Sequence, residues 1–435
     1  MEKQNQNIVI IGGGFAGVEM AEQLLKAGYR GKIILVDKNN YNFFPPLLYQ
    51  FATGFLDISN ISYPFRKYFR NHPAFRFRMG SLVAVRAEDQ VAVLDNGEIH
   101  YDQLIIATGT VSNYFGNEHI RQHSFPMKTI GDAVTLKNRL LERLEVASRL
   151  TDQAKKDRLT TFVIAGGGPT GVEIAGMLSE LRKNILHKDY PELAGCKMDI
   201  YLVDGLPALL SPMSKKSQAY AKSTLEQMGV IIRLGQVVKD YKDHVVLLAD
   251  GTTIETDNLI WTAGVTGQLF EGLAKESYGK GNRLLTDAYS RVTGTANIYA
   301  IGDSSLMTAD PAFPNGHPQL AQVALQQAAQ LAHNIISETK GRGAKAFRYK
   351  DRGSMAIISR NKAVADLTGP LRHFQGFFAW LIWIFVHLMS LINLRNKITT
   401  LFNWYNAYIT RDQPLRMIID AKNNPPAEDK SQARF

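Results

Sequence analysis

Short apolar runs that alternate with helix-like stretches dominate the first two thirds of the chain. Ile8–Ile11 and Phe162–Ala165 are apolar at every position, which is typical of parallel strands that are buried on both faces. A glycine-rich turn follows each run, and apolar residues at helical spacing follow each turn. The pattern predicts an α/β fold in which the series strand, turn and helix occurs twice.

The two turns share the spacing Gly-x-Gly-x-x-Gly, with Gly12, Gly14 and Gly17 in the first and Gly166, Gly168 and Gly171 in the second. In such a loop the first glycine makes the tight turn, the second lets the backbone approach a pyrophosphate, and the third lets the helix pack on the strand. The phosphates then bind the unpaired N–H groups at the positive end of the helix. Two loops of this kind predict two dinucleotide sites.

An aspartate ends the second strand of each unit, where a carboxylate can bind ribose hydroxyls. Asp37 lies 20 residues beyond Gly17, which is the usual spacing, whereas Asp204 lies 33 residues beyond Gly171. An aspartate is also common at strand ends that bind nothing. A carboxylate facing the adenosine ribose accepts a hydrogen bond from a 2′-hydroxyl and repels a 2′-phosphate, so Asp204 predicts a preference for NADH over NADPH.

The two units also match in length. The first closes with a strand at 104–109 that ends in Ala107-Thr108-Gly109, and the second with a strand at 259–264 that ends in Ala263-Gly264. From first to closing glycine the intervals are 97 and 98 residues, which we interpret as an internal duplication. A hairpin-like region is expected over 75–85 and 91–99, an irregular proline-stiffened segment over 42–50, and a late strand over 297–303.

Composition narrows the chemistry. The 435 residues include one cysteine, Cys196, which excludes an intrachain disulfide, a cysteine-based zinc or iron–sulfur site, and a dithiol redox centre. No metal-binding cluster and no signal peptide is visible. A hydrophobic content of 45% with 21% charged residues describes a folded protein.

The two glycine loops, the Ala-Thr-Gly of the first unit and a late Gly302-Asp303 together resemble the flavoproteins with two dinucleotide-binding domains. The resemblance covers the chain from its start to about residue 335. It implies that the first unit binds FAD, that an inserted second unit binds NADH, and that Asp303 contacts the ribityl–phosphate region of FAD. Members that reduce disulfides, peroxides or sulfide carry redox cysteines beside the flavin, so Cys196 alone excludes those branches.

A second pattern, Ala-Gln-x-Ala-x-Gln, begins at Ala321. Pro318 favours a helix start nearby, and Gln322 and Gln326 share one helix face because they are four residues apart. The pattern resembles the signature of the type II NADH:quinone oxidoreductases. The resemblance implies that both glutamines contact a quinone beside the flavin, although glutamines at this spacing also occur on ordinary solvated helices.

The resemblance assigns further roles. For FAD it implies contacts from Gly12, Gly14, Phe15, Ala16, Gly17, Asp37, Lys38, Ala107, Thr108, Gly109, Gly302, Asp303, Ala321 and Gln322. For NADH it implies contacts from Gly166, Gly168, Pro169, Thr170, Gly171, Glu173, Asp204, Ala263 and Gly264. For quinone it implies contacts from Tyr49, Gln50, Gln322 and Gln326.

The catalytic candidates are Glu173, Gln322 and Gln326. In the family a glutamate at the position of Glu173 handles protons or binds quinone. A glutamate in the first turns of a helix is also an ordinary partner of the helix dipole, and Glu19 occupies the same place in the first unit.

The C-terminal region is apolar and basic. Residues 374–394 approach transmembrane length, and Ile398, Leu401, Phe402, Tyr405, Tyr408 and Ile409 then recur at helical spacing around Trp404, which suits a membrane headgroup zone. Between Gly341 and Met417, 12 lysines and arginines stand against three aspartates. We expect two helices in one leaflet with basic residues on anionic headgroups, as the family resemblance also implies. A membrane span and an apolar dimer interface are the alternatives. His387 is expected to be a packed or interfacial histidine rather than a proton relay.

We therefore predict two Rossmann-like dinucleotide-binding domains, for FAD and NADH, the second inserted in the first, plus a C-terminal membrane-associating helical region. The expected boundaries are 1–120 and 281–340 for the FAD domain, 121–157 for a connecting helical segment, 158–280 for the NADH domain, 341–417 for the membrane-docking region and 418–435 for a flexible tail.

The predicted activity is FAD-dependent transfer of electrons from NADH to a membrane quinone, menaquinone or ubiquinone, without ion pumping. The expected location is the cytoplasmic face of the inner (cell) membrane, with monotopic attachment, and a homodimer remains open.

Two other functions also remain open. One is an NADH-dependent reductase of a protein acceptor such as a ferredoxin or rubredoxin, against which the apolar C-terminal helices argue. The other is a non-catalytic sensor that binds FAD and NADH, which the two glutamines disfavour. Nucleic-acid binding is disfavoured because the charges flank apolar helices rather than base-stacking positions.

Overall fold

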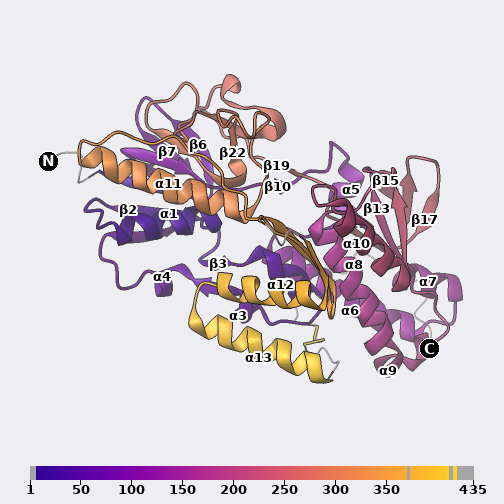
Figure 1. Ribbon diagram of the computed structural model, residues 1–435. Coiled ribbons are helices and arrows are strands. Elements are labelled where there is room, and N and C mark those ends of the chain that lie inside the picture. Colours follow the sequence, from indigo (N-terminus) through magenta and orange to yellow (C-terminus); the bar gives the residue numbers. More distant parts are fainter. Residues whose placement is uncertain (1–5, 370–372, 411–414, 419–435) are drawn as a thin grey trace.

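The computed structural model describes residues 6–369, 373–410 and 415–418, and two parallel five-stranded sheets form its centre (Figure 1). The first sheet, in the order β21-β9-β1-β2-β5, contains β1 (Ile8–Ile11), β2 (Ile33–Asp37), β5 (Phe75–Met79), β9 (Gln103–Ile106) and β21 (Ile298–Ala300). The second, in the order β11-β18-β12-β13-β14, contains β11 (Phe125–Pro126), β12 (Phe162–Ala165), β13 (Ile200–Asp204), β14 (Val230–Leu234) and β18 (Asn258–Trp261). The predicted α/β class with two repeated units is confirmed.

Each sheet is covered by helices on one face and by a small antiparallel sheet on the other. In β1, Ile8 and Ile10 pack toward α1 (Phe15–Lys26) and α11 (Ala321–Thr339), whereas Val9 and Ile11 pack toward the small sheet. The small sheets are β6 (Leu82–Arg86), β7 (Val91–Leu94) and β8 (Gly97–His100) on the first unit, and β15 (Val238–Lys242), β16 (Val245–Leu248) and β17 (Thr253–Glu255) on the second. Two-sided burial explains why the strands are apolar at every position.

The remaining elements connect the units. The helices are α2 (Leu48–Ala52), α3 (Ile58–Ile61), α4 (Phe65–Tyr68), α5 (Glu118–His123), α6 (Ile130–Arg149), α7 (Gln153–Thr160), α8 (Pro169–Leu181), α9 (His187–Asp189) and α10 (Lys215–Gln227). The short strand pairs are β3 (Tyr41–Phe43) with β4 (Ser62–Pro64), β10 (Val111–Ser112) with β19 (Val265–Thr266), and β20 (Leu284–Thr286) with β22 (Ser305–Met307).

A third layer follows α11. It consists of an antiparallel sheet and two helices that lie side by side along one end of the molecule (Figure 1). The elements are β23 (Ser354–Ser359), β24 (Lys362–Asp366), β25 (His373–Gly376), α12 (Phe377–Ser390) and α13 (Leu394–Thr410). β23 packs against α8, so this layer is attached to the second unit.

Three sequence expectations are corrected here. Phe75–Met79 is a parallel strand of the first main sheet rather than part of a hairpin, and the expected hairpin-like region is formed by β6, β7 and β8, which pair antiparallel. The segment 42–50 is not wholly irregular, because it contains parts of β3 and α2 and a 3₁₀ turn at Pro45–Leu47. The connecting segment contains β11, which joins the second sheet. The expected helix start near Pro318 is confirmed, because α11 begins three residues after it.

The C-terminal apolar run forms a helix shorter than the run itself, which argues against the alternative of a membrane span and agrees with the preferred expectation of helices that do not span. α12 covers only 14 residues of it, about 21 Å of helix against a hydrocarbon core of about 30 Å. Within the described ranges, no helix is long and apolar enough to cross a membrane. The expected flexible tail, 418–435, lies outside the described residues apart from Ile418.

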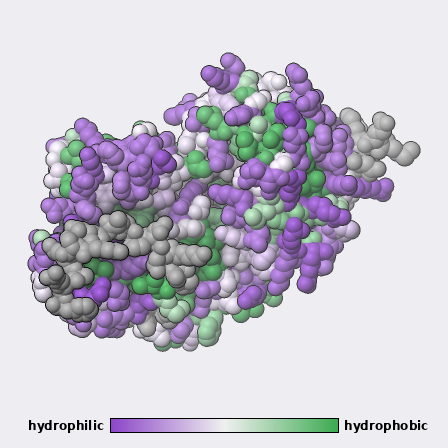
Figure 2. All heavy atoms as spheres, turned by 180° about the vertical axis from the view of Figure 1, so that it is seen from behind, coloured by the Kyte–Doolittle hydropathy of each residue, from purple (hydrophilic) through white to green (hydrophobic). Residues whose placement is uncertain are grey.

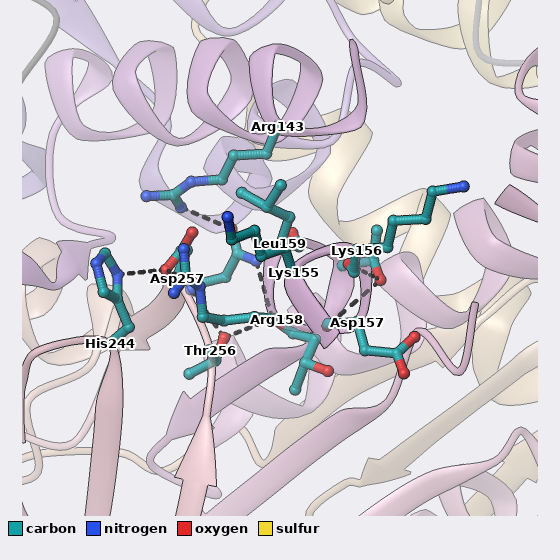
Figure 3. A network of polar contacts seen from close by, with 12 residues as sticks. Arg143, Lys155, Lys156, Asp157, Arg158, Leu159, His244, Thr256 and Asp257 are labelled. Atoms are coloured by element: carbon teal, nitrogen blue, oxygen red, sulfur yellow. Dashed lines mark hydrogen bonds and ion pairs between the residues drawn. The ribbon is translucent and has the colours of Figure 1, made fainter. Parts of the chain in front are cut away.

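A polar network holds α6 and α7 to the second sheet at the edge opposite the glycine loop (Figure 3). Arg143 on α6 donates to Asn258 Oδ1 at 2.6 Å, and Asn258 donates to two backbone carbonyls just before β12. The Asp257 carboxylate lies 2.5 Å from His244 Nδ1 and 3.3 Å from Arg158 Nε. Because the side chain of Asp257 is only 9% exposed, its charge depends on these partners.

We predict that Asp257→Ala lowers the free energy of unfolding by about 1–3 kcal/mol, since it removes a buried carboxylate and the ion pair that it forms with Arg158. That corresponds to a fall of about 1 °C in the thermal midpoint per kcal/mol for a chain of this length. Differential scanning fluorimetry measures it. Asp89→Ala is the matched control, because Asp89 pairs with Arg86 on the open surface and such pairs contribute about 0–1 kcal/mol. Equal shifts for the two variants would contradict the assignment.

Candidate functional site

The two glycine loops repeat the same close approach to a neighbouring strand. Gly12 has φ +104°, and a Cβ there would collide with the carbonyl oxygen of Ala107. Gly166 has φ +111°, and its Cβ would collide with the backbone of Thr262. Any other residue would separate β1 from β9 or β12 from β18, so both loops depend on glycine at this position.

The second glycine of each loop leaves open space. No atom lies within 4 Å of a Cβ built on Gly14 or Gly168. These residues are the N-caps of α1 and α8, and neither helix start has a side-chain cap. The first N–H groups of both helices therefore face open space, as a pyrophosphate requires. In the first unit the buried Thr108 Oγ1 also has no partner. The residues fit two dinucleotides.

Each strand-end aspartate holds its glycine loop. Asp37 accepts hydrogen bonds from the Gly13 and Asn39 amides, both at 2.7 Å. Asp204 accepts from Gly167 and, at 2.6 Å, from Leu206. Burial raises the pKa of Asp37, although these hydrogen bonds oppose the shift. Although Asp204 lies further beyond its glycine loop in the sequence than Asp37 does, it makes the equivalent hydrogen bond to that loop.

The FAD candidates lie in strand order along the carboxyl edge of the first sheet. From β2 to β21 the edge presents Asp37, the Gly12–Gly17 loop, Thr108-Gly109 and then Gly302-Asp303. Lys38 is exposed beside Asp37. The turn at Gly302 is fixed by Gln327, whose buried Oε1 accepts from the Gly302 amide at 2.7 Å. Sequence reasoning missed Gln327, which follows directly after the glutamine pattern.

The NADH candidates meet at the matching edge of the second sheet. Pro169 and Thr170 at the start of α8 are exposed, as is Ala263 after β18. Gly264, the next residue, lies under the ring of Phe115, where a Cβ would be 2.8 Å from the ring. The structure therefore brings the predicted residues of each set together, while their roles stay predictions.

Glu173 is buried in α8, with 7% of its surface exposed. Burial raises its pKa well above the ordinary value of 4.5, and a hydrogen bond from the Ile357 amide opposes the shift. Gly176, one turn further along α8, lets β23 approach so closely that a Cβ would collide with the Ile358 carbonyl. Glu19 in the first unit is only half-buried and accepts from Gln23, so the two glutamates are not equivalent.

A chain of side-chain hydrogen bonds leads from Tyr49 to the C-terminal helices. Burial raises the pKa of Tyr49 well above its ordinary value. The Tyr49 hydroxyl accepts from Gln50 Nε2 at 3.0 Å, and Gln50 Oε1 accepts from Trp404 Nε1 at 2.8 Å. Trp404 is 7% exposed, so the expectation that it faces a headgroup zone is wrong.

A pocket of about 680 Å³, including its open mouth, lies between α8, β23 and the two C-terminal helices. Its walls are mostly apolar and aromatic. They include Trp380, Trp383, Trp404, Tyr408, Met177 and Gln50. The indole N–H of Trp383 is buried and has no hydrogen-bond partner. Residues of both C-terminal helices therefore line a mostly apolar pocket together with Gln50.

The side-chain amides of Gln322 and Gln326 on α11 form hydrogen bonds with backbone groups. Gln322 donates to the Gly353 carbonyl at 2.9 Å and accepts from the Arg352 amide at 3.1 Å. Gln326 does the same with both backbone groups of Lys350. Both amides therefore fasten the segment before β23 to α11, a role that sequence reasoning did not identify. Their quinone contact stays a prediction.

His387 is a packed histidine in α12. Its ring stacks on Trp383 with centroids 4.0 Å apart, and Nδ1 contacts the Trp383 carbonyl at 2.8 Å. Burial lowers the pKa of His387 from 6.5 to about 4. The ring is therefore neutral near pH 7, which agrees with the expectation that His387 is a packed histidine rather than a proton relay.

Two family models match the chain. Residues 6–328 match the pyridine nucleotide-disulphide oxidoreductases, and residues 352–412 match the NDH2 C-terminal domain.

Curated relatives match nearly the whole length. The type II NADH:quinone oxidoreductase Ndh of Mycobacterium tuberculosis is 34% identical, over 96% of this chain and 91% of that protein. NdhA of the same organism, also a type II NADH:quinone oxidoreductase, is 36% identical, over 93% of this chain and 87% of its own length.

Solved structures share the fold. NDH2 from Plasmodium falciparum, in complex with NADH, superposes with a TM-score of 0.84 at 20% identity, covering 96% of this chain and all of that one. The sulfide:quinone oxidoreductase of Aquifex aeolicus superposes with a TM-score of 0.71 at 19% identity, covering 93% and 95%.

The burial of Glu173 predicts a pH-dependent effect of Glu173→Gln. A raised pKa keeps the folded state protonated where the unfolded carboxyl is already ionised, so the wild type loses stability as pH rises above 4.5. Glutamine removes this loss. We expect the thermal midpoint of the variant to match the wild type near pH 4.5 and to exceed it increasingly toward pH 8.

Glu19→Gln is the matched control, at the same motif position in α1. It is expected to show no such pH-dependent gain. A gain of Glu173→Gln that is the same at pH 5 and pH 8 would contradict the buried, protonated carboxyl.

Proposed function

This chain belongs to the type II NADH:quinone oxidoreductases, and we infer that it transfers electrons from NADH to a membrane quinone through FAD without pumping ions. FAD, when bound, supplies the chemistry, because it accepts a hydride from NADH and passes two electrons on to the quinone. The first unit holds FAD along Asp37, the first glycine loop, Thr108-Gly109 and Asp303. The second holds NADH along its glycine loop and Asp204.

One observation carries the quinone assignment. The pocket beside α12 and α13 has mostly apolar and aromatic walls, and Gln50, which lines it, donates to the Tyr49 hydroxyl. An isoprenoid quinone needs an apolar route, whereas a protein acceptor or a purely sensing role needs none. We propose that the quinone enters between these helices and that Glu173, whose pKa is raised by burial, supplies a proton to it.

We further propose that α12 and α13 dock on an anionic membrane. Their outward side chains are large, apolar and 38–71% exposed, and comprise Phe377, Phe378, Leu381, Phe385, Val386, Met389, Leu394, Ile398, Leu401, Phe402, Tyr405 and Ile409. By contrast, hydrophilic residues cover most of the face seen in Figure 2, and apolar residues form separate patches there. Contiguous apolar helix faces with basic residues nearby are typical of interfacial helices.

The proposed location is the cytoplasmic face of the inner (cell) membrane, where NADH is available. We keep the domain boundaries proposed from the sequence, 1–120 with 281–340, 121–157, 158–280 and 341–417. The sheet order supports the return to the FAD domain, since β21 joins the first sheet after the second is complete, whereas β11 ties the segment 121–157 to the second sheet.

We predict rapid oxidation of NADH that depends on added short-chain quinone, and much slower oxidation of NADPH because Asp204 repels a 2′-phosphate. The assay follows NADH absorbance of the yellow protein in mild detergent. If NADH bleaches the flavin but quinone fails to restore its colour, a protein acceptor becomes the better assignment. A preparation that cannot be reconstituted with FAD would rule out the function.

Replacing Gln322 is predicted to separate the two half-reactions. Gln322→Leu removes its amide from the segment before β23 and from any quinone, so reoxidation of the flavin by quinone is expected to slow about tenfold, the value of one hydrogen bond to a polar group. Reduction by NADH stays near the wild-type rate in stopped-flow measurements. Gln330→Leu is the control, because Gln330 contacts only Asn334 on the same helix. Equal slowing in both variants would exclude a specific role.

Membrane docking is tested with vesicles. Phe378→Ser and Phe402→Ser together are expected to reduce co-sedimentation with vesicles containing anionic phosphatidylglycerol, because both side chains are more than 60% exposed. Leu269→Ser, which is 64% exposed elsewhere on the molecule, should leave binding unchanged. If the double variant keeps vesicle binding but loses a dimer in sedimentation velocity, the helix face is a subunit interface instead.

A further inference from the structure

Lys128 occupies the junction between the two units. It follows β11, an edge strand of the second sheet, and precedes α6. The start of α6 fixes its backbone, because Asp132 accepts hydrogen bonds from the Lys128 and Thr129 amides at 3.0 and 2.8 Å. The side chain nevertheless points to the first unit, where Nζ donates to Thr110 Oγ1 at 2.8 Å.

The ammonium of Lys128 is incompletely partnered. It has three N–H donors, and Thr110 Oγ1 is its one hydrogen-bond acceptor within the described ranges. Among those residues no carboxylate forms an ion pair with it at 4.0 Å or less, and the Asp303 carboxylate lies beyond Thr110 Oγ1, at 3.5 Å from that oxygen. Burial lowers the pKa of Lys128, and the charge of Asp303 opposes this. Burying a cation whose N–H donors lack acceptors costs free energy, unless a bound ligand accepts those hydrogen bonds.

The order of the binding residues along the carboxyl edge of the first sheet indicates which part of FAD would accept the remaining hydrogen bonds of Lys128. From β2 through β1 to β9 and β21 the edge presents the ribose-binding Asp37, the pyrophosphate loop, Thr108-Gly109 and then Asp303. FAD bound in that order has its adenosine at β2 and its isoalloxazine ring beyond β9. Thr110 follows Gly109 and leads into β10, which pairs with β19 of the second unit. The ring must lie at this junction, since nicotinamide held by the second unit has to reach it.

We propose that Lys128 contacts the isoalloxazine ring of FAD and is a flavin-binding cation contributed by the segment that links the two units. Its ammonium donates to a polar atom of the ring, with Thr110 and Asp303 holding it in place. The inference rests on the proposed function, in that FAD occupies the first unit. Because the reduced ring carries more negative charge than the oxidised ring, a cation in contact raises the midpoint potential of the flavin.

The test replaces Lys128 with methionine, which keeps most of the side-chain length and loses the charge. We expect FAD to dissociate from Lys128→Met with at least a tenfold higher Kd, measured by flavin fluorescence on titration of the apoprotein. We also expect the midpoint potential of the bound flavin to shift to more negative values in spectroelectrochemical titration. Lys128→Arg, which keeps the cation, should restore both properties toward the wild type.

Lys137→Met is the matched control. Lys137 is a buried lysine on α6 whose pKa is also lowered by burial, but it donates to the Leu415 carbonyl and lies over the ring of Phe51. Its replacement should leave the Kd for FAD and the potential unchanged. If Lys128→Met does not fold, Lys128→Gln replaces it in the same measurements.

Three results would overturn the inference. They are an unchanged Kd and potential in the Lys128 variant, the same shift in the Lys137 variant, and a weaker Kd with no change in potential, which would place the ammonium on the ribityl chain. None of these readouts depends on quinone turnover. A wild-type protein that binds FAD but does not reduce quinone would therefore defeat the proposed function without deciding this inference.

Discussion

The close approach of each glycine loop to the neighbouring closing strand is the constraint on which the rest of the structure depends. At Gly12 and Gly166 the backbone touches the strand that closes its unit, so neither position has room for a side chain. This contact presents the first amides of α1 and α8 at the carboxyl edge of each sheet, and a strand-end aspartate locks the turn from the other side. Two dinucleotides can then face each other across the junction only if both loops hold this geometry.

A second close approach attaches the C-terminal layer to this core. A glycine inside a helix costs about 1 kcal/mol relative to alanine, yet Gly176 lies in the middle of α8. Its missing side chain lets β23 pack directly on the helix, and the Ile357 amide consequently reaches Glu173. The same contact fixes α12 and α13 in place, because they are joined to the β23–β25 sheet. The environment of the buried carboxyl and the position of the apolar helices therefore have one structural cause.

The sequence predicted those parts of the molecule that follow from local pattern. Apolar strands, glycine spacing and strand-end acids identified both units, and Asp204 adopts the geometry of Asp37 despite its late position. The local pattern could not predict side-chain directions and partners that depend on tertiary packing. The apolar period of α13 does not reveal that Trp404 points inward to Gln50. The spacing of Gln322 and Gln326 does not reveal that backbone groups 24 to 31 residues further along the sequence hydrogen-bond to their amides. Lys128 belongs to no motif, and only the fold brings it to Thr110.

The two faces of the C-terminal helices explain why the structure keeps polar groups in an otherwise apolar layer. Outward side chains are large, apolar and exposed, whereas inward ones include Trp383, Trp404 and Tyr408, which line the pocket. If the layer served only to attach the protein to a membrane, a fully apolar inner face would pack equally well and would avoid burying Gln50 and the unpartnered indole N–H of Trp383. Gln50 is hydrogen-bonded to Tyr49 and Trp404 and also lines the pocket, so the inner face offers a partly polar wall within an apolar layer. A quinone, with its apolar tail and two carbonyls, has the chemistry that suits such a wall.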